Sequence, residues 1–260
     1  MNSRIRNIII IVLLAAIVVT FHIVRRNATM RGLEISVVDR QPNIITADDI
    51  DSILMASFPS LTKTDIKDID RDAIVDKLCE NPYILEASAH TTTGGKLQVN
   101  VTPRIPVVRM FYQDNEFYIS HEGTFMPITA KHYCYTLIGN SNADEPRLKK
   151  PSGINLADTA VKKQPSSLVK VWKTASYLYD NPAYGDIFDQ VSIAENGDIC
   201  LVPKLGQLTV ILGDTTQMQT KFENLWAFLD QGISLVGWNT YSTINLKYKN
   251  QVVCTKKTIN

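Results

Sequence analysis

The chain has 260 residues, 45% hydrophobic and 20% charged, a composition typical of a folded protein with one or two domains. Its formal net charge is +1 at pH 7, so it lacks the overall basic field that holds nucleic-acid phosphates. The sequence also contains no Cys-x-x-Cys pair and no block rich in lysine and arginine. We therefore expect no nucleic-acid partner.

An uncharged apolar run occupies residues 8–24, with arginines close on both sides. A helix of this length rises about 25 Å at 1.5 Å per residue, enough to cross a bilayer. A cleaved signal peptide has a shorter apolar region followed by small residues at the cut site, which this sequence lacks. We predict a stub at residues 1–7 and an uncleaved transmembrane anchor at 8–24, with a buried core helix as the alternative. The flanking arginines barely decide its orientation.

Residues 33–104 have the pattern of a small helix-on-sheet domain. After a first alternating strand, Thr46 and Asp49 have the spacing of a capping box at the start of a helix. Asp70 can cap a second helix, and Gly94-Gly95 separates two further strand patterns as in a hairpin. The predicted order is strand, helix, helix, strand, strand.

Residues 105–260 predict a second, larger domain, a mostly antiparallel sheet with two helices. The helices are expected at 166–180 and 215–230, and residues 139–153 are expected to form a loop. The apolar stripe of the second helix consists of Met218, Phe222, Leu225, Trp226 and Leu229. The whole chain is therefore assigned to the α+β class, with a single N-terminal transmembrane helix.

The stretch "KLQVNVTPRIPVVRMFY" at residues 96–112 joins the two predicted domains. It begins and ends as a strand, but Pro103 and Pro106 interrupt it, and proline cannot donate to a sheet ladder. We interpret the prolines as a stiff joint that limits how the domains swing. The alternative is an edge strand with a bulge inside a single domain.

The order of these segments resembles the FtsQ/DivIB family of bitopic cell-division proteins over nearly the whole chain. The resemblance rests on "GLEISVV", "ITADDI", "EFYISHEGTFMPI", "LTVILGD…KFENLWAFL" and "INLKYKNQVV", taken in order and spacing. Asn245 and Lys247 are conservative substitutions in the family's near-terminal strand, and three further departures from the family pattern occur. Pro103 replaces a glutamate, His121 replaces an acidic residue, and Thr255 and Lys256 stand where some members carry a tryptophan.

The resemblance implies a single-pass protein of the inner membrane, with a cytoplasmic N-terminus and a periplasmic POTRA-like domain and β domain, enriched at the division septum. It implies a non-enzymatic scaffold without cofactor or metal, whose partners are FtsB-like and FtsL-like coiled-coil membrane proteins. Partner binding is expected by strand addition at the C-terminal sheet edge. The tentative partner-binding positions are Lys247, Tyr248, Gln251, Val252, Val253 and Cys254. Lys247 is expected to meet an acidic partner residue, while Tyr248 either anchors the interface or packs on its own sheet.

Other functions have weaker support in the sequence. A membrane-anchored cell-wall hydrolase would need a nucleophile and a base, but no P-loop, Gly-x-Ser-x-Gly or dinucleotide motif occurs. His121, His132 and Cys134 do not have the usual spacing of zinc ligands. A POTRA-bearing factor for outer-membrane protein assembly or secretion usually carries repeated POTRA units or a large barrel. The sequence shows neither pattern, so this alternative is weaker. The four cysteines form no motif, and we expect Cys79 and Cys200 to be buried.

Overall fold

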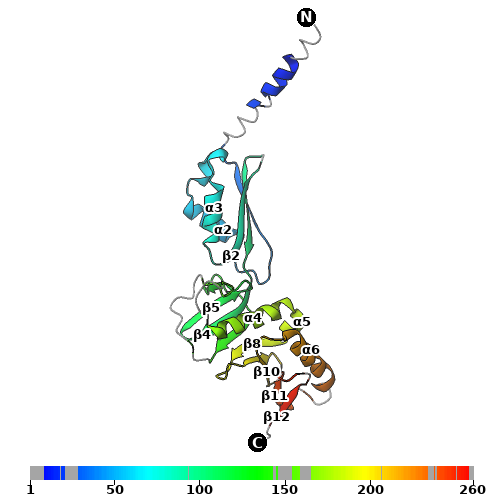
Figure 1. The fold of residues 1–260 in the computed structure, drawn as a ribbon. Coiled ribbons are helices and arrows are strands. Elements are labelled where there is room, and N and C mark those ends of the chain that lie inside the picture. The colour runs from blue at the N-terminus through cyan, green and yellow to red at the C-terminus, as the bar shows by residue number, and fades with distance from the viewer. Residues whose placement is uncertain are drawn as a thin grey trace. The chain divides into compact units, whose positions relative to one another are not determined.

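The computed structural model describes residues 9–17, 19–20, 29–92, 94–142, 145, 154–158, 165–205, 207–233, 237, 239–249 and 251–257. The chain divides into two compact units, Met1–Pro103 and Arg104–Asn260 (Figure 1). Each unit has its own sheet. The boundary between the units falls at the proline-flanked stretch.

The described part of the first unit contains a three-stranded sheet with two helices on one of its faces (Figure 1). The strand order is β1-β3-β2, with β1 parallel and β2 antiparallel to the central β3. The elements are β1 (Gly32–Val37), α2 (Ala47–Ser57), η1 (Leu61–Lys63), η2 (Ile66–Asp68), α3 (Arg71–Cys79), β2 (Ile84–Thr91) and β3 (Lys96–Pro103). This order of strands and helices agrees with the predicted one.

The starts of both helices confirm the predicted caps. At α2 the Thr46 hydroxyl accepts a hydrogen bond from the Asp49 N–H at 3.4 Å, and the Asp49 carboxylate accepts one from the Thr46 N–H at 2.8 Å. At α3 the Asp70 carboxylate accepts from the Ala73 N–H at 3.0 Å. Each cap satisfies main-chain donors that the first helical turn leaves without a partner.

The prediction that Cys79 is buried is wrong, because its side chain is exposed at the end of α3. The buried residues of α3 are Ile74 and Leu78. Each step along an α-helix turns the side chain by about 100°, so the residue after Leu78 points away from the sheet. Cys200 is half-buried rather than fully buried.

The chain passes from one sheet to the other over two residues. Pro103 is the last residue of β3, where it pairs with Ile84 of β2, and Pro106 is the first residue of β4 (Pro106–Tyr112). Strand β3 belongs to the three-stranded sheet and β4 to the sheet of the second unit. The prolines thus stand at strand ends, where a missing N–H is tolerated.

The described part of the second unit is built on a nine-stranded sheet, ordered β12-β11-β10-β9-β8-β7-β4-β5-β6. Its remaining strands are β5 (Asn115–Ser120), β6 (Phe125–Pro127), β7 (Leu137–Ser141), β8 (Phe188–Ile193), β9 (Ile199–Pro203), β10 (Thr209–Gly213), β11 (Tyr241–Asn245) and β12 (Val253–Lys256). Neighbours are parallel in β4-β7, β7-β8 and β10-β11, and antiparallel elsewhere in the described sheet. The sheet is therefore mixed, with a larger parallel share than the sequence pattern suggested.

Strand β7 lies in the middle of the sheet, although the predicted loop began at Gly139, inside this strand. A Cβ atom on Gly139 would lie 2.8 Å from both the Met110 sulfur and a Val108 methyl carbon, and 3.1 Å from Val171. Only glycine fits between strand β4 and the helix above it. The segment "LIGNS" is short and partly polar, so it lacks the alternation by which strands are recognised.

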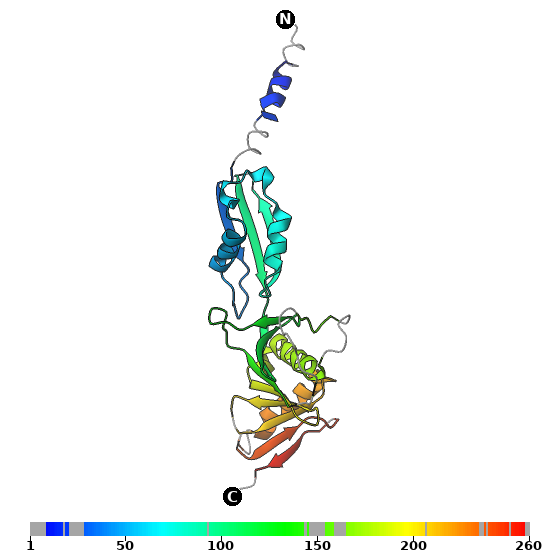
Figure 2. The same ribbon diagram turned by 90° about the vertical axis from the view of Figure 1, so that its left-hand side faces the viewer.

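Helix α4 (Ser166–Asp180) has the predicted bounds and packs on β4, β7 and β8 (Figure 2). A short helix, α5 (Pro182–Gly185), follows it. Helix α6 (Met218–Phe228) continues into the π-helix η3 (Leu229–Ile233). Of its expected apolar stripe, Phe222 and Leu225 are buried, but Trp226 is 50% exposed, so that part of the stripe was assigned wrongly.

Residues 9–17 and 19–20 at the N-terminus are helical. No helix within the described residues is both long enough and apolar enough to span a membrane. Of the predicted anchor, residues 8, 18 and 21–24 lie outside the described residues, as does the stub at 1–7.

Candidate functional site

The two edges of the nine-stranded sheet differ in how they end. At β6, the Phe125 N–H donates to the Ile154 carbonyl at 2.9 Å, and the Leu156 N–H donates to the Gly123 carbonyl at 2.8 Å. The segment around Asn155 thus covers this edge, and Pro127 ends the strand. At the opposite edge, β12 pairs with β11, and no other strand among the described residues adjoins it. An open edge presents unpaired main-chain groups to a further strand.

Strand β12 has two different faces. Val253 pairs with Asn245, and its side chain is 41% exposed. Cys254 pairs with the buried Ile244 and packs against the hydrophobic core. A strand added beside β12 would therefore extend the core on one face and meet solvent-exposed side chains on the other.

The other predicted site residues lie next to β12 rather than within a strand. Strand β11 ends at Asn245, so Lys247 and Tyr248 belong to the turn that follows it, where both were expected in a strand. The Asn245 side chain explains this end, because its Oδ1 accepts the Lys247 N–H at 3.0 Å and turns the backbone. Gln251 and Val252 precede β12, and Val252 packs against the core.

Tyr248 projects from this turn with half of its surface exposed, at 50%. The structure therefore places Tyr248, in the turn between β11 and β12, at the same corner of the described sheet as β12. The other half of its surface is covered, so both expected roles of Tyr248, interface anchor and packing on its own sheet, stay predictions.

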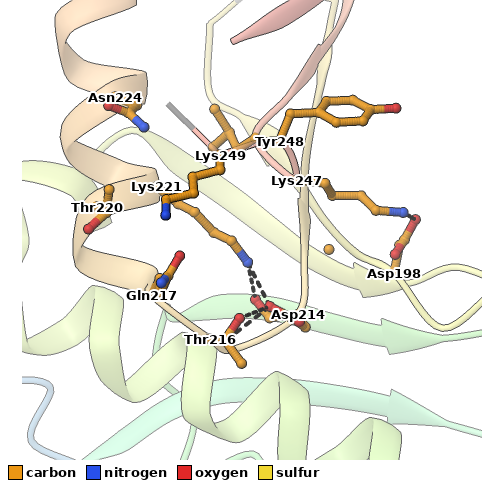
Figure 3. A pocket seen from close by; sticks show the side chains of 12 residues that line it. Asp198, Asp214, Thr216, Gln217, Thr220, Lys221, Asn224, Lys247, Tyr248 and Lys249 are labelled. Atoms are coloured by element: carbon orange, nitrogen blue, oxygen red, sulfur yellow. Dashed lines mark hydrogen bonds and ion pairs between the residues drawn. The ribbon is translucent and has the colours of Figure 1, made fainter. Parts of the chain in front are cut away.

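A pocket of about 390 Å³ adjoins the turn (Figure 3). Its walls come from the end of β10, the first turns of α6 and the residues after β11. The lining residues are Asp198, Gly213, Asp214, Thr216, Gln217, Thr220, Lys221, Asn224, Leu246, Lys247, Tyr248 and Lys249. The "LGD" turn and the lysine-bearing helix are among the motifs that resemble the family, but no local pattern in the sequence connects them to the turn at Tyr248.

Two ion pairs organise this pocket. The Lys221 ammonium lies 2.7 Å from the Asp214 carboxylate and also donates to the Asp214 carbonyl at 3.0 Å. Hydrogen bonds from Lys221 and Thr216 lower the pKa of Asp214 to about 2. The Lys247 ammonium lies 2.7 Å from the Asp198 carboxylate. Each of these two lysines is thus paired with an aspartate, and Lys249 adds a third ammonium group to the polar lining of the pocket.

Comparison with protein families decides the identity of the second unit. A sequence model described as "FtsQ/DivIB, C-terminal related" matches residues 105–255, which is more than half of the chain. The chain belongs to the FtsQ/DivIB family. A second model, described as a POTRA-like domain, matches residues 29–102. No curated protein matches the chain closely enough to be named as a relative.

This FtsQ/DivIB-type chain carries its candidate site within the family match, at the end of residues 105–255. Members of the family are generally non-catalytic, and the family and the POTRA-like domain together suggest a role as a cell-division scaffold.

The residues considered for zinc make separate contacts in this FtsQ/DivIB-type chain. His121 Nε2 lies 3.0 Å from the Asp180 carboxylate, and His132 Nδ1 lies 2.9 Å from the Thr129 hydroxyl. The main chain of Cys134 is held by the Tyr118 hydroxyl, at 3.0 Å from both its N–H and its carbonyl. Within the described residues, no group of three or more His, Cys, Asp or Glu side chains is arranged to bind a metal.

Proposed function

We propose that this chain is a non-enzymatic scaffold of the divisome, which links cell-division proteins at the septum. The observation that carries the proposal is the asymmetry of the nine-stranded sheet. One edge is covered by the segment around Asn155, whereas no further described strand pairs with β12, which has the exposed Tyr248 beside it. An open edge strand next to an exposed aromatic side chain is the arrangement that strand addition uses.

The partner in this proposal is an FtsB-like coiled-coil membrane protein, with an FtsL-like protein in the same assembly. Its extended segment pairs with β12 through main-chain hydrogen bonds. Alternate side chains of that segment meet Cys254 on the core-facing side and Val253 on the other side. Main-chain pairing supplies affinity, and these alternating contacts supply selectivity.

Residues 8–24 anchor the chain in the inner membrane in this proposal, with the N-terminus in the cytoplasm and the bulk of the chain in the periplasm. The uncharged sequence of this run supports the anchor. In the structure, the described large apolar side chains between residues 9 and 19 are 48–65% exposed, which suits contact with lipid better than contact with water.

Site-specific photo-crosslinking in dividing cells tests the proposed binding edge. One photoreactive residue replaces Tyr248, and a control replaces Asp51, which is exposed on α2 of the first unit. We expect an FtsB-like protein to be captured at position 248 and not at 51. A folded, septum-located protein that gives no adduct at 248 would place the partner surface elsewhere.

Two further measurements separate the alternative functions. A factor for outer-membrane protein assembly or secretion would be distributed around the envelope, so enrichment of a fluorescent fusion at the septum speaks against it. A cell-wall hydrolase would release fragments from purified peptidoglycan, and we expect the purified chain to release none.

A further inference from the structure

The ion pair between Lys247 and Asp198 joins two distant parts of the second unit. Lys247 Nζ lies 2.7 Å from Asp198 Oδ2, and 49 residues separate them in sequence. Asp198 stands in the turn between β8 and β9, while Lys247 stands in the turn after β11. The Asp198 side chain is 19% exposed and that of Lys247 is 42% exposed. Partial burial of the carboxylate makes this pair less screened than a fully exposed one.

The path of the Lys247 side chain depends on Gly213. This glycine ends β10 with φ at +83°, and a Cβ atom there would lie 2.6 Å from Lys247 Cγ and 3.2 Å from Cδ. The aliphatic stem of Lys247 therefore crosses the bare Cα of Gly213 on its way to Asp198. A side chain at position 213 would block this path. The glycine at the end of β10 therefore allows the Lys247 side chain to reach Asp198.

Two hydrogen bonds fix the backbone at Leu246 and Lys247. The Leu246 N–H donates to the Ile211 carbonyl at 2.9 Å, and the Lys247 N–H donates to Asn245 Oδ1 at 3.0 Å. Tyr248 follows directly. Figure 3 shows the Lys247 side chain directed to Asp198, with the ring of Tyr248 standing apart from that pair.

We infer that Lys247 is a positioning residue, whose ion pair with Asp198 across Gly213 fixes the turn that presents Tyr248. The inference rests on the proposed function of this corner as a partner-binding site. It differs from the expectation that Lys247 itself meets an acidic partner residue. The Lys247 ammonium already has a carboxylate within the chain, at 2.7 Å.

The two roles of Lys247 predict different mutant behaviour. If Lys247 positions the turn, Asp198→Asn and Lys247→Met remove the same ion pair, so each lowers the adduct yield at position 248 by about threefold to fivefold. The double variant is then no worse than either single variant. The charge swap Asp198→Lys with Lys247→Asp restores the yield. Asp186→Asn, which removes an exposed carboxylate elsewhere in the unit, is the matched control.

Direct contact of Lys247 with an acidic partner gives the opposite pattern. Lys247→Met then lowers the yield, Asp198→Asn leaves it unchanged or raises it, and the charge swap remains defective. That pattern would overturn the inference while leaving strand addition intact.

A second measurement needs no partner. In the purified full-length chain, amide hydrogen exchange of residues 246–249 should become faster in Asp198→Asn than in the parent protein, with an unchanged rate in Asp186→Asn. Equal exchange in the parent and Asp198→Asn proteins would overturn the inference. If the parent chain gives no adduct at position 248, the proposed function fails, and the exchange rates alone decide whether the ion pair fixes the turn.

Discussion

The main-chain N–H of Ser167 donates a hydrogen bond to the Glu145 carboxylate at 3.0 Å, across 22 residues of sequence. Ser167 lies in the first turn of α4, whose N-cap residue, Pro165, supplies no side-chain cap. The hydroxyls of Ser166 and Ser167 donate to the same carboxylate. Glu145 therefore caps the helix from outside its own sequence, and its negative charge lies at the positive end of the helix dipole.

The Glu145 cap predicts a pH-dependent stability. Burial alone would raise the pKa of Glu145, but hydrogen bonds from Ser167 and Ser166 outweigh it and lower the pKa below its ordinary value of 4.5. A carboxylate with a lowered pKa in the folded state stabilises the fold above its unfolded pKa, and this stabilisation disappears as the pH falls through its folded pKa. Glu145→Ala should therefore cost about 1 kcal/mol of unfolding free energy at pH 7 and less below pH 4.

Denaturant unfolding at pH 7 and at about pH 3 checks this prediction, with Glu195→Ala as the control at an exposed turn position. A loss that is the same at both pH values would show that Glu145 acts without its charge. The Tyr112 hydroxyl also contacts Glu145. Burial and the nearby Glu145 charge raise the pKa of Tyr112 to about 12, so its titration does not contribute between pH 3 and pH 7.

Gly139 in the central strand β7 should tolerate no side chain. A Cβ atom there would lie 2.8 Å from atoms of Val108 and Met110, so Gly139→Ala forces the packed core apart and should cost about 1–3 kcal/mol. Gly32→Ala in β1 is the control, since its nearest neighbour would lie 3.9 Å away. Thermal unfolding of both variants measures the difference, and equal midpoints would contradict the central position of β7.

Tyr248 should contribute to binding and not to stability. Because its side chain is 50% exposed, Tyr248→Ala should change the unfolding free energy by less than about 0.5 kcal/mol. Loss of an aromatic interface anchor should weaken partner binding by more than about 1 kcal/mol, about fivefold in affinity. Tyr135→Ala, at a tyrosine that is 73% exposed and precedes β7, should leave binding unchanged. A destabilised Tyr248→Ala protein would favour packing of Tyr248 on its own sheet.

The four cysteines should differ in reactivity. Cys79 is exposed, whereas burial raises the pKa values of the Cys134, Cys200 and Cys254 thiols and so reduces their thiolate fractions. A thiol reagent added to the native protein should therefore label one cysteine rapidly. Cys79→Ser should remove that fast phase, and a fast phase that survives would show that one of the other three thiols is accessible, against their partial burial.

Local patterns in the sequence were enough to predict the elements of the first unit. The Thr46–Asp49 box, the Asp70 cap and the Gly94-Gly95 hairpin act within a few residues, so the sequence contains nearly all the information that they need. The bounds of α4 were also predicted, because its apolar positions repeat with the helical period. The family resemblance, which depends on the order of such segments, was confirmed by the family match.

The tertiary structure decided what depends on contacts between distant segments. Strand β7 is stabilised by parallel neighbours on both sides, so its own sequence carries little strand signal. Likewise, the exposure of Trp226 and the cap that Glu145 gives to α4 depend on packing partners far along the chain. The sequence by itself determined the type of protein, while the region that it assigns to partner binding stays a prediction. Only the fold could bring Asp198, Gly213 and Lys247 together beside Tyr248, because each lies on a different segment and no local pattern links them.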